Sequence, residues 1–259
     1  MKISLHALGH KRAAGLTRFL LTGGTGFLGS HIAVELLKRG YPVCLLARAD
    51  KARTSEKRVS DLLDWFGLPQ SDRRKLRVVP GDITRPALGL DAAAYADLLQ
   101  NTDEIVHCAS NTSFSERNRA EVEAVNTTGL SYVLDFVRAG RAYFFHHVST
   151  AYVAGKTAGH CPEILSAGRE FHNAYEETKC LGERAVLEAC RASGLRVSIY
   201  RPSIVYGDSR TGRSTLFTAV YYPVRLALFL KDIYEKDIRE QGGKKALEMG
   251  ARIEKDGSL

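Results

Sequence analysis

In two places a lysine follows a tyrosine by four residues. At this spacing the phenol, a weak acid, can lie next to the lysine cation. Tyr152 and Lys156 belong to "HVSTAYVAGK", and Tyr175 and Lys179 belong to "AYEETK". The chain has 11 tyrosines, and chance alone gives about half of one such match in a chain of this composition. The local context therefore has to decide which pair does chemistry.

Helical context favours the second pair. On a helix, residues i and i+4 share a face, so the ammonium of Lys179 can lie beneath the phenol of Tyr175. The surrounding "NAYEETKCLGERAVLEAC" contains no proline, and only Gly182 weakens it. Tyr152 and Lys156 instead enclose "VAG" at the end of a predicted strand, where a helical turn is not expected. We predict that Tyr152 is a packing or pocket-wall residue.

The chemistry expected of such a pair is proton transfer to a carbonyl oxygen. A tyrosine titrates near 10, and a lysine cation together with an oxidised nicotinamide lowers that pKa by favouring phenolate. The phenol can then protonate an oxygen that gains charge as hydride arrives. A hydroxyl must also hold that oxygen, and Ser149 and Thr150 lie where ligands of open α/β sheets bind, at the end of the fifth predicted strand.

The elements that position these residues alternate between short apolar runs and longer helical patterns. Continuous apolar strands joined by helices predict a doubly wound parallel sheet, the Rossmann fold. The predicted strands span 18–23, 42–48, 76–82, 104–110, 142–150 and 196–202. The predicted helices span 29–39, 54–66, 117–139 and 174–192, with a shorter one at 91–99 and a helical region after Arg213.

A glycine loop joins the first strand to the first helix. "TGGTGFLG" places Gly23, Gly26 and Gly29 in a G-x-x-G-x-x-G pattern, which permits a tight turn and close approach of the backbone to a pyrophosphate. The position between strand and helix makes the pattern a strong indication of a dinucleotide site. The alternative is a glycine-rich turn that binds nothing.

The end of the second strand favours NADPH over NADH. Arg48 stands where an NAD enzyme usually carries a carboxylate, and the first carboxylate is Asp50. A guanidinium can form a fork with a 2′-phosphate, although a solvated arginine beside an NAD site is the alternative. Asp82, after the third strand, either meets the adenine or caps a turn.

Composition narrows the class of protein. The chain has 259 residues, 44% of them hydrophobic, and a net charge of +8, which favours anionic partners. Its basic residues cluster only at Arg48, Lys51, Arg53, Lys57 and Arg58, and this cluster fits a phosphorylated small molecule as well as RNA. Because basic and aromatic residues do not interleave, we expect no nucleic-acid partner.

The five cysteines and three strand histidines predict neither disulfides nor a metal site. Five is an odd number, and no C-x-x-C pair occurs, so a reduced cytoplasmic location is expected. His107, His146 and His147 lack ligand spacing and are interpreted as packing residues. No apolar run predicts a signal peptide or a membrane span, because Leu216 to Leu230 is short and interrupted.

Five motifs together carry a family resemblance. "TGGTGFLG", "GDIT", "HVSTAYVAG", "YEETK" and "YRPSIVYGDSRTG" resemble the extended short-chain dehydrogenase/reductase superfamily. More narrowly, they resemble its fatty acyl-CoA reductase and carrier-protein thioester reductase branch, the male-sterility type. The resemblance spans about 18–212, so 1–17 is an N-terminal extension and 213–259 a partial substrate-binding region. The family usually continues beyond that point to complete the acyl and pantetheine site.

The resemblance implies functional residues. Thr150, Tyr175 and Lys179 would form the catalytic triad, and no metal takes part. The implied cofactor contacts are Gly23, Thr25, Gly26, Phe27, Leu28, Gly29, Arg48, Asp82, Ile83, Ala109, Asn126, Tyr175, Lys179, Pro202 and Ser203. In this scheme Arg48 meets the 2′-phosphate, Asp82 and Ile83 meet the adenine, and Pro202 and Ser203 line the nicotinamide.

The implied activity is NADPH-dependent reduction of an acyl thioester, on coenzyme A or a carrier protein, to the aldehyde or alcohol. The stretch Leu216 to Leu230 is either part of an acyl channel or a plain packing helix. One alternative is a sugar-nucleotide epimerase or dehydratase, or a ketone reductase, of the same superfamily. Another is a cofactor-binding protein without turnover. The sequence leaves the oligomeric state open.

Overall fold

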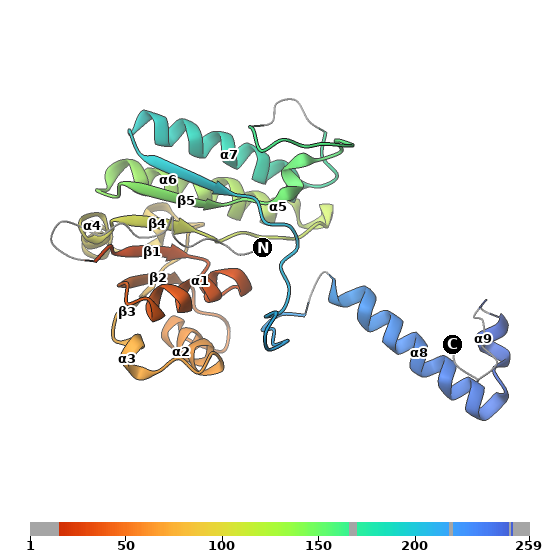
Figure 1. The fold of residues 1–259 in the computed structure, drawn as a ribbon. Helices are drawn as coiled ribbons and strands as arrows, with labels where there is room; N and C mark the ends of the chain where they lie inside the picture. The colour runs from red at the N-terminus through yellow and green to blue at the C-terminus, as the bar shows by residue number, and fades with distance from the viewer. Residues whose placement is uncertain (1–15, 166–169, 218–219, 249, 251–259) are drawn as a thin grey trace. The chain divides into compact units, whose positions relative to one another are not determined.

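The core of the computed structural model is a six-stranded parallel sheet (Figure 1). The structure describes residues 16–165, 170–217, 220–248 and 250. The strand order is β3-β2-β1-β4-β5-β6, which is the order of the Rossmann fold. The strands are β1 (Phe19–Thr22), β2 (Val43–Ala47), β3 (Leu76–Pro80), β4 (Glu104–His107), β5 (Phe144–Val148) and β6 (Arg196–Tyr200). The predicted fold class is confirmed.

Alternate side chains of β1, β2 and β4 enter two separate cores. Leu21, Leu45 and Val106 pack with the first two helices, α1 (Phe27–Lys38) and α2 (Ser55–Trp65). Leu20, Leu46 and Ile105 face the opposite side. That side is covered by α4 (Ala92–Asn101), α6 (Leu130–Ala139) and α7 (Ala174–Ala192). Burial on both faces explains why the strands read as continuous apolar runs.

The direction of winding reverses between β1 and β4. The chain proceeds outward from β1 to β2 and β3, and then returns to pair β4 with the other edge of β1. Helices therefore leave the carboxyl ends of β1 and β4 on opposite faces, and a crevice opens there. The glycine loop follows β1, and the loop from Cys108 onward follows β4, so both contribute to this crevice.

The predicted helix at 117–139 is divided into four consecutive helical segments. It consists of the 3-10 turn η3 (Glu116–Asn118), α5 (Arg119–Glu123), the π-helical turn η4 (Ala124–Gly129) and α6. A π turn inserts one extra residue into the helical register, and here it contains Asn126, whose amide makes several hydrogen bonds described below. Smaller elements that the sequence did not predict are α3 (Gln70–Arg73), η2 (Pro86–Gly89) and η5 (Ala151–Ala154).

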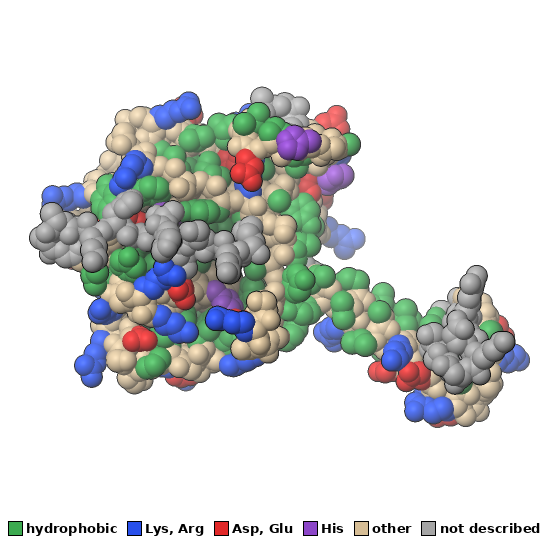
Figure 2. Space-filling model, viewed as in Figure 1, with side chains coloured by type: hydrophobic (Ala, Val, Ile, Leu, Met, Phe, Trp, Pro, Cys, Tyr) green, Lys and Arg blue, Asp and Glu red, His purple; other side chains and the backbone are tan. Residues whose placement is uncertain are grey.

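The chain divides into two compact units, Met1–Ser203 and Ile204–Leu259. The predicted domain boundary after residue 212 stays a prediction, and most of the predicted extension at 1–17 lies outside the described residues. The second unit contains α8 (Tyr221–Gln241) and α9 (Lys244–Glu248). Apolar side chains of α8 are exposed, as Figure 2 shows in green, including Leu226, Leu228 and Phe229. Among the helices that the structure describes, none is long and apolar enough to cross a membrane.

Candidate active site

The glycine loop is a tight turn in which a side chain at Gly23 or Gly29 would clash with the backbone. We call this loop the glycine cradle. Gly23 has φ of +74°, and a Cβ there would lie 2.4 Å from the backbone nitrogen of Ala109. A Cβ on Gly29 would lie 2.2 Å from the carbonyl oxygen of Gly23. Gly26 is the N-cap residue of α1 and has no capping side chain. The first amides of α1 are therefore available to an anion at the helix N-terminus.

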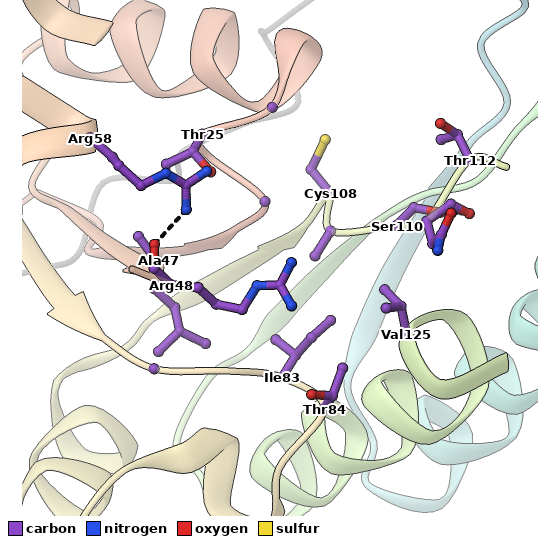
Figure 3. A pocket seen from close by; sticks show the side chains of 16 residues that line it. Thr25, Ala47, Arg48, Arg58, Ile83, Thr84, Cys108, Ser110, Thr112 and Val125 are labelled. Atoms are coloured by element: carbon purple, nitrogen blue, oxygen red, sulfur yellow. Dashed lines mark hydrogen bonds between the residues drawn. The ribbon is translucent and has the colours of Figure 1, made fainter. Parts of the chain in front are cut away.

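A cavity of about 440 Å³ opens above this loop (Figure 3). It lies between the carboxyl ends of β1, β2, β3 and β4. Its lining residues are Gly23, Thr25, Gly26, Leu46, Ala47, Arg48, Arg58, Gly81, Ile83, Thr84, Cys108, Ala109, Ser110, Asn111, Thr112 and Val125. The structure thus brings together six of the predicted cofactor contacts: Gly23, Thr25, Gly26, Arg48, Ile83 and Ala109. The other predicted contacts do not line this cavity.

Two arginines of the basic cluster reach the cavity. Arg48 extends into it, and Arg58 lies along its wall beside Thr25 (Figure 3). The guanidinium of Arg58 donates to the Thr25 hydroxyl at 3.3 Å and to the carbonyl oxygen of Arg48. Both arginines therefore line the cavity at the carboxyl end of β2.

Carboxylates pair with several charges of this cluster. Arg53 pairs with Asp50 at 2.7 Å, and Lys57 pairs with Asp61 at 2.7 Å. The Nε of Arg58 also lies 3.3 Å from Asp50. Asp50, the first carboxylate after β2, is thus engaged by Arg53, and this hydrogen bond holds its pKa low, at about 2. On the face drawn in Figure 2, lysine and arginine side chains are scattered and form no continuous band.

Asp82 acts as a turn cap in this structure. Its Oδ1 accepts from the backbone nitrogen of Thr84 at 2.9 Å and from the Thr84 hydroxyl at 2.8 Å. Its other oxygen lies 3.8 Å from the Arg48 guanidinium. This arrangement matches the turn-cap alternative, and the predicted adenine contact stays a prediction.

Tyr175 lies in the first turn of α7. The side chain of Asn173 caps this helix by accepting from the backbone nitrogen of Glu176 at 3.0 Å. Glu116 accepts from the backbone nitrogen of Ala174 at 2.8 Å. Two side chains therefore fix the helix start one residue before the tyrosine. The phenol is buried and neighbours Thr150, the N-cap residue of the 3-10 turn that follows β5.

The pKa of the Tyr175 phenol is raised, which differs from the direction expected. Burial is the main cause, and the Thr150 hydroxyl opposes the rise. A nearby lysine charge lowers the pKa of a phenol, but the loss of hydration on burial raises it. A raised pKa keeps the phenol protonated at neutral pH, so it can serve as a proton donor.

Lys179 lies one helical turn beyond Tyr175 and is buried. Its ammonium donates to the carbonyl oxygen of Val148 at 2.6 Å. Burial lowers the pKa of Lys179 to about 8, and Cys108 and Glu183 oppose that change. His107 and His147 are buried near this cation, and burial together with Lys179 lowers the pKa of both imidazoles. Neutral imidazoles there avoid two further positive charges, consistent with the predicted packing role.

The other tyrosine lies within a short 3-10 turn, and its lysine follows the end of that turn. Tyr152 lies in the 3-10 turn η5, which Gly155 ends at φ of +57°. The expectation of no helical turn at this position was therefore wrong. The ammonium of Lys156 lies 3.3 Å from Glu170. Lys156 therefore has a carboxylate as its partner.

The two hydroxyls after β5 differ in their contacts. The Thr150 hydroxyl accepts from the backbone nitrogen of Tyr152 at 3.2 Å, which leaves its own proton free for another acceptor. The Ser149 hydroxyl is buried and makes no hydrogen bond to the described residues. Among the two, Thr150 is the one that neighbours the Tyr175 phenol.

A family model described as male sterility protein matches residues 21–238, which include the glycine loop and both pairs. The chain belongs to the male sterility protein family. The resemblance inferred from the five motifs is confirmed at this level. An isonitrile lipopeptide synthase from Streptomyces coeruleorubidus is 35% identical over 212 residues, covering 79% of this chain and 14% of the synthase.

Solved structures share the fold of this male sterility family member. The terminal R domain from the myxalamid PKS-NRPS biosynthetic pathway has a TM-score of 0.71 and 28% identity, covering 83% of this chain and 55% of that one. UDP-glucuronic acid 4-epimerase from Bacillus cereus, in complex with NAD, has a TM-score of 0.58 and 21% identity, covering 74% and 58%. The epimerase likeness shows a shared fold alone. The chain spans about half the length of these solved proteins.

Asn126 contacts the loop after β4 in this family member, and its predicted contact with the cofactor stays a prediction. Its amide does not line the cavity; it braces the loop after β4. Its Oδ1 accepts from the backbone nitrogen of Asn111 at 2.9 Å and from the Ser110 hydroxyl at 3.0 Å, and its Nδ2 donates to the Asn111 carbonyl at 3.0 Å. The same Nδ2 reaches Thr178 on α7 at 3.2 Å. Pro202 and Ser203 also lie outside the cavity lining, although the Pro202 carbonyl accepts from Ala151 at 2.9 Å.

Sequence reasoning missed part of the cavity wall. Arg58 belonged to the noted basic cluster, and its position ten residues after Arg48, on the helix that follows, was the available signal. Cys108, Ser110, Asn111 and Thr112 directly follow β4 and could have been found from the rule that strand carboxyl ends bind ligands. Burial raises the pKa of the Cys108 thiol to about 11, so it lines the wall as a neutral group.

Proposed function

We propose that this chain is an NADPH-dependent reductase of acyl thioesters that are bound to a carrier protein. The observation that carries the proposal is the placement of Tyr175, Thr150 and Lys179. These side chains lie at the carboxyl ends of β4 and β5, next to the strand that leads into the glycine cradle. A proton donor and an anion cradle at one edge of the sheet fit hydride transfer to a carbonyl.

The residues present fit a dinucleotide phosphate. Gly23 and Gly29 leave space that any Cβ would fill, and the N-terminus of α1 faces it. Ile83 and Ala109 supply apolar walls to the cavity. Arg48 and Arg58 supply two cations where a 2′-phosphate would lie, and Asp50 is paired with both Arg53 and Arg58. These contacts support NADPH over NADH.

Each catalytic side chain has a distinct role in the proposed reaction. The bound dinucleotide supplies hydride to the thioester carbonyl carbon. Thr150 holds the carbonyl oxygen, and Tyr175 donates its phenolic proton to that oxygen, which gives a hemithioacetal. Lys179 stabilises the phenolate left on Tyr175 until a proton returns from solvent. The carbon–sulfur bond then breaks, so the thiol leaves and the aldehyde is released.

Carrier-bound substrates are favoured by the relatives. The synthase with 35% identity is named for lipopeptide synthesis, and the solved R domain belongs to a PKS-NRPS pathway. The branch that the five motifs resemble includes carrier-protein thioester reductases. The net charge of +8 is suited to an acidic carrier.

The test combines the 259-residue chain with NADPH and acyl pantetheine thioesters, and the aldehyde is trapped as a hydrazone for mass spectrometry. We expect aldehyde to form in proportion to the NADPH that is consumed. Absence of aldehyde from any thioester, with turnover of a nucleotide sugar instead, would support the epimerase alternative. Binding of NADPH without any turnover would support a protein that only binds the cofactor.

A further inference from the structure

An exposed phenylalanine lies against both tyrosines of the site. Phe114 is 49% exposed. Its ring centroid lies 5.5 Å from that of Tyr175, tilted by 32°, and 5.3 Å from that of Tyr152, edge to face at 69°. One part of the ring therefore covers the proposed proton donor, and the remainder is open to a ligand.

The loop that carries Phe114 also forms part of the cavity wall. Ser110, Asn111 and Thr112 line the cavity, and Phe114 follows two residues later. The loop thus leads from the proposed cofactor cavity to the proposed proton donor. A substrate carbonyl that receives hydride on one side and a proton on the other has to lie along this path.

Hydrogen bonds fix this loop to α7 on both sides of Phe114. On one side, Asn126 binds the backbone of Asn111 and reaches Thr178 at 3.2 Å. On the other side, Glu116 accepts from the backbone nitrogen of Ala174 at 2.8 Å. Thr178 and Ala174 flank Tyr175 on the same helix. The position of Phe114 relative to Tyr175 is therefore set by the fold before a substrate arrives.

A packing role alone does not explain why the side chain of Phe114 is half exposed. Two other apolar neighbours of Tyr175 are buried, with Val122 at 0% and Ala174 at 1% exposed, and Tyr152 is partly buried. A phenylalanine that only supported the tyrosine would gain free energy from being buried to the same degree. Half of the ring instead presents apolar surface beside the phenol.

We propose that Phe114 is a specificity-determining residue, which contacts the apolar group attached to the reacting carbonyl carbon. Tyr152 forms the adjoining wall through its ring. This assignment rests on the proposed reductase function and deepens it. It implies that thioesters with an extended apolar group are preferred over acetyl thioesters. Whether that group belongs to a fatty acid or to an aminoacyl unit, the contact is the same.

The experiment compares the 259-residue chain with Phe114→Ala and Phe114→Leu, using acetyl-, hexanoyl- and N-acetyl-leucyl-pantetheine with NADPH. We expect Phe114→Ala to lower kcat/KM for the hexanoyl and leucyl thioesters about tenfold more than for the acetyl thioester. Phe114→Leu, which keeps apolar volume, should restore most of that ratio. Leu181→Ala is the matched control, because Leu181 is 47% exposed on α7 and should leave the ratio unchanged.

The outcomes separate this assignment from the proposed function. A selective loss for only one of the two extended thioesters supports the contact and identifies the source of the acyl group. An equal loss for all three thioesters would overturn the assignment, because Phe114 would then only support Tyr175. If the unmodified chain reduces none of the thioesters, the proposed function fails and the assignment fails with it.

Discussion

Lys179 donates a hydrogen bond from its ammonium to the carbonyl oxygen of Val148, 2.6 Å away. This bond joins α7 to the last residue of β5, two positions before Thr150. The buried cation therefore also holds the helix of Tyr175 against the strand end that carries the hydroxyl. One interaction positions both proposed ligands of the substrate oxygen.

The pKa of Lys179 predicts a loss of reductase activity in mild alkali. Burial lowers this pKa to about 8, whereas the pKa of Tyr175 is raised above 10. As the pH rises, the lysine loses its proton first, and the cation that stabilises the phenolate disappears. We expect kcat to be level below pH 7 and to fall as the pH passes about 8.

The check is the pH profile of kcat for the unmodified chain and for Lys179→Arg. The arginine stays charged, so any activity it keeps should show no fall near pH 8. The same fall in the arginine variant would assign that titration to another group.

Arg48 and Arg58 should determine the preference for NADPH. Removing a cation that holds a phosphate costs about 10-fold to 100-fold in affinity. We expect Arg58→Ala to raise the KM for NADPH by this factor and to change the KM for NADH less than twofold. Arg48→Ala should act in the same direction. Lys57→Ala is the control, since its ammonium pairs with Asp61 and does not line the cavity. Equal effects on both cofactors would contradict the assignment.

His107 should make the fold sensitive to acid. Burial lowers its pKa from 6.5 to about 3, so between these values the unfolded chain binds a proton that the folded chain does not. Stability is then present above pH 6.5 and is lost as the pH falls toward 3. This group alone should reduce the free energy of unfolding by about 2 kcal/mol between pH 7 and pH 5.

Urea unfolding at the two pH values measures this loss. His107→Gln, which can keep the hydrogen bond to Thr22, should show a smaller loss than the unmodified chain. His160→Gln, at an exposed position, should behave as the unmodified chain does. An unchanged loss in His107→Gln would assign the acid sensitivity elsewhere.

The sheet was predictable because each of its central strands is a short, continuous apolar run. Leu20 and Leu21 face opposite cores, so the strand is apolar throughout and stands out between helical patterns. The glycine loop was predictable because Gly23 and Gly29 have no room for a side chain. Both features depend on residues within one short segment, so they can be predicted from the local sequence.

Contacts between distant segments were not predictable from local patterns. The π turn η4 directs the amide of Asn126 to Asn111 and Thr178, and no local motif predicts these hydrogen bonds. The direction in which the pKa of Tyr175 shifts depends on how deeply the whole fold buries the phenol. Arg58 reaches the cavity only because α2 folds back over the end of β2. Each of these features depends on packing that no single motif encodes.

The central claim is that Tyr175 protonates a thioester carbonyl that receives hydride from NADPH. The most direct measurement is deuterium transfer from NADPH labelled at C4 to the aldehyde product, followed by mass spectrometry under single-turnover conditions. We expect labelled aldehyde from the unmodified chain and from Tyr152→Phe, and at least a 100-fold slower transfer from Tyr175→Phe. Normal transfer in Tyr175→Phe together with loss in Tyr152→Phe would contradict the account.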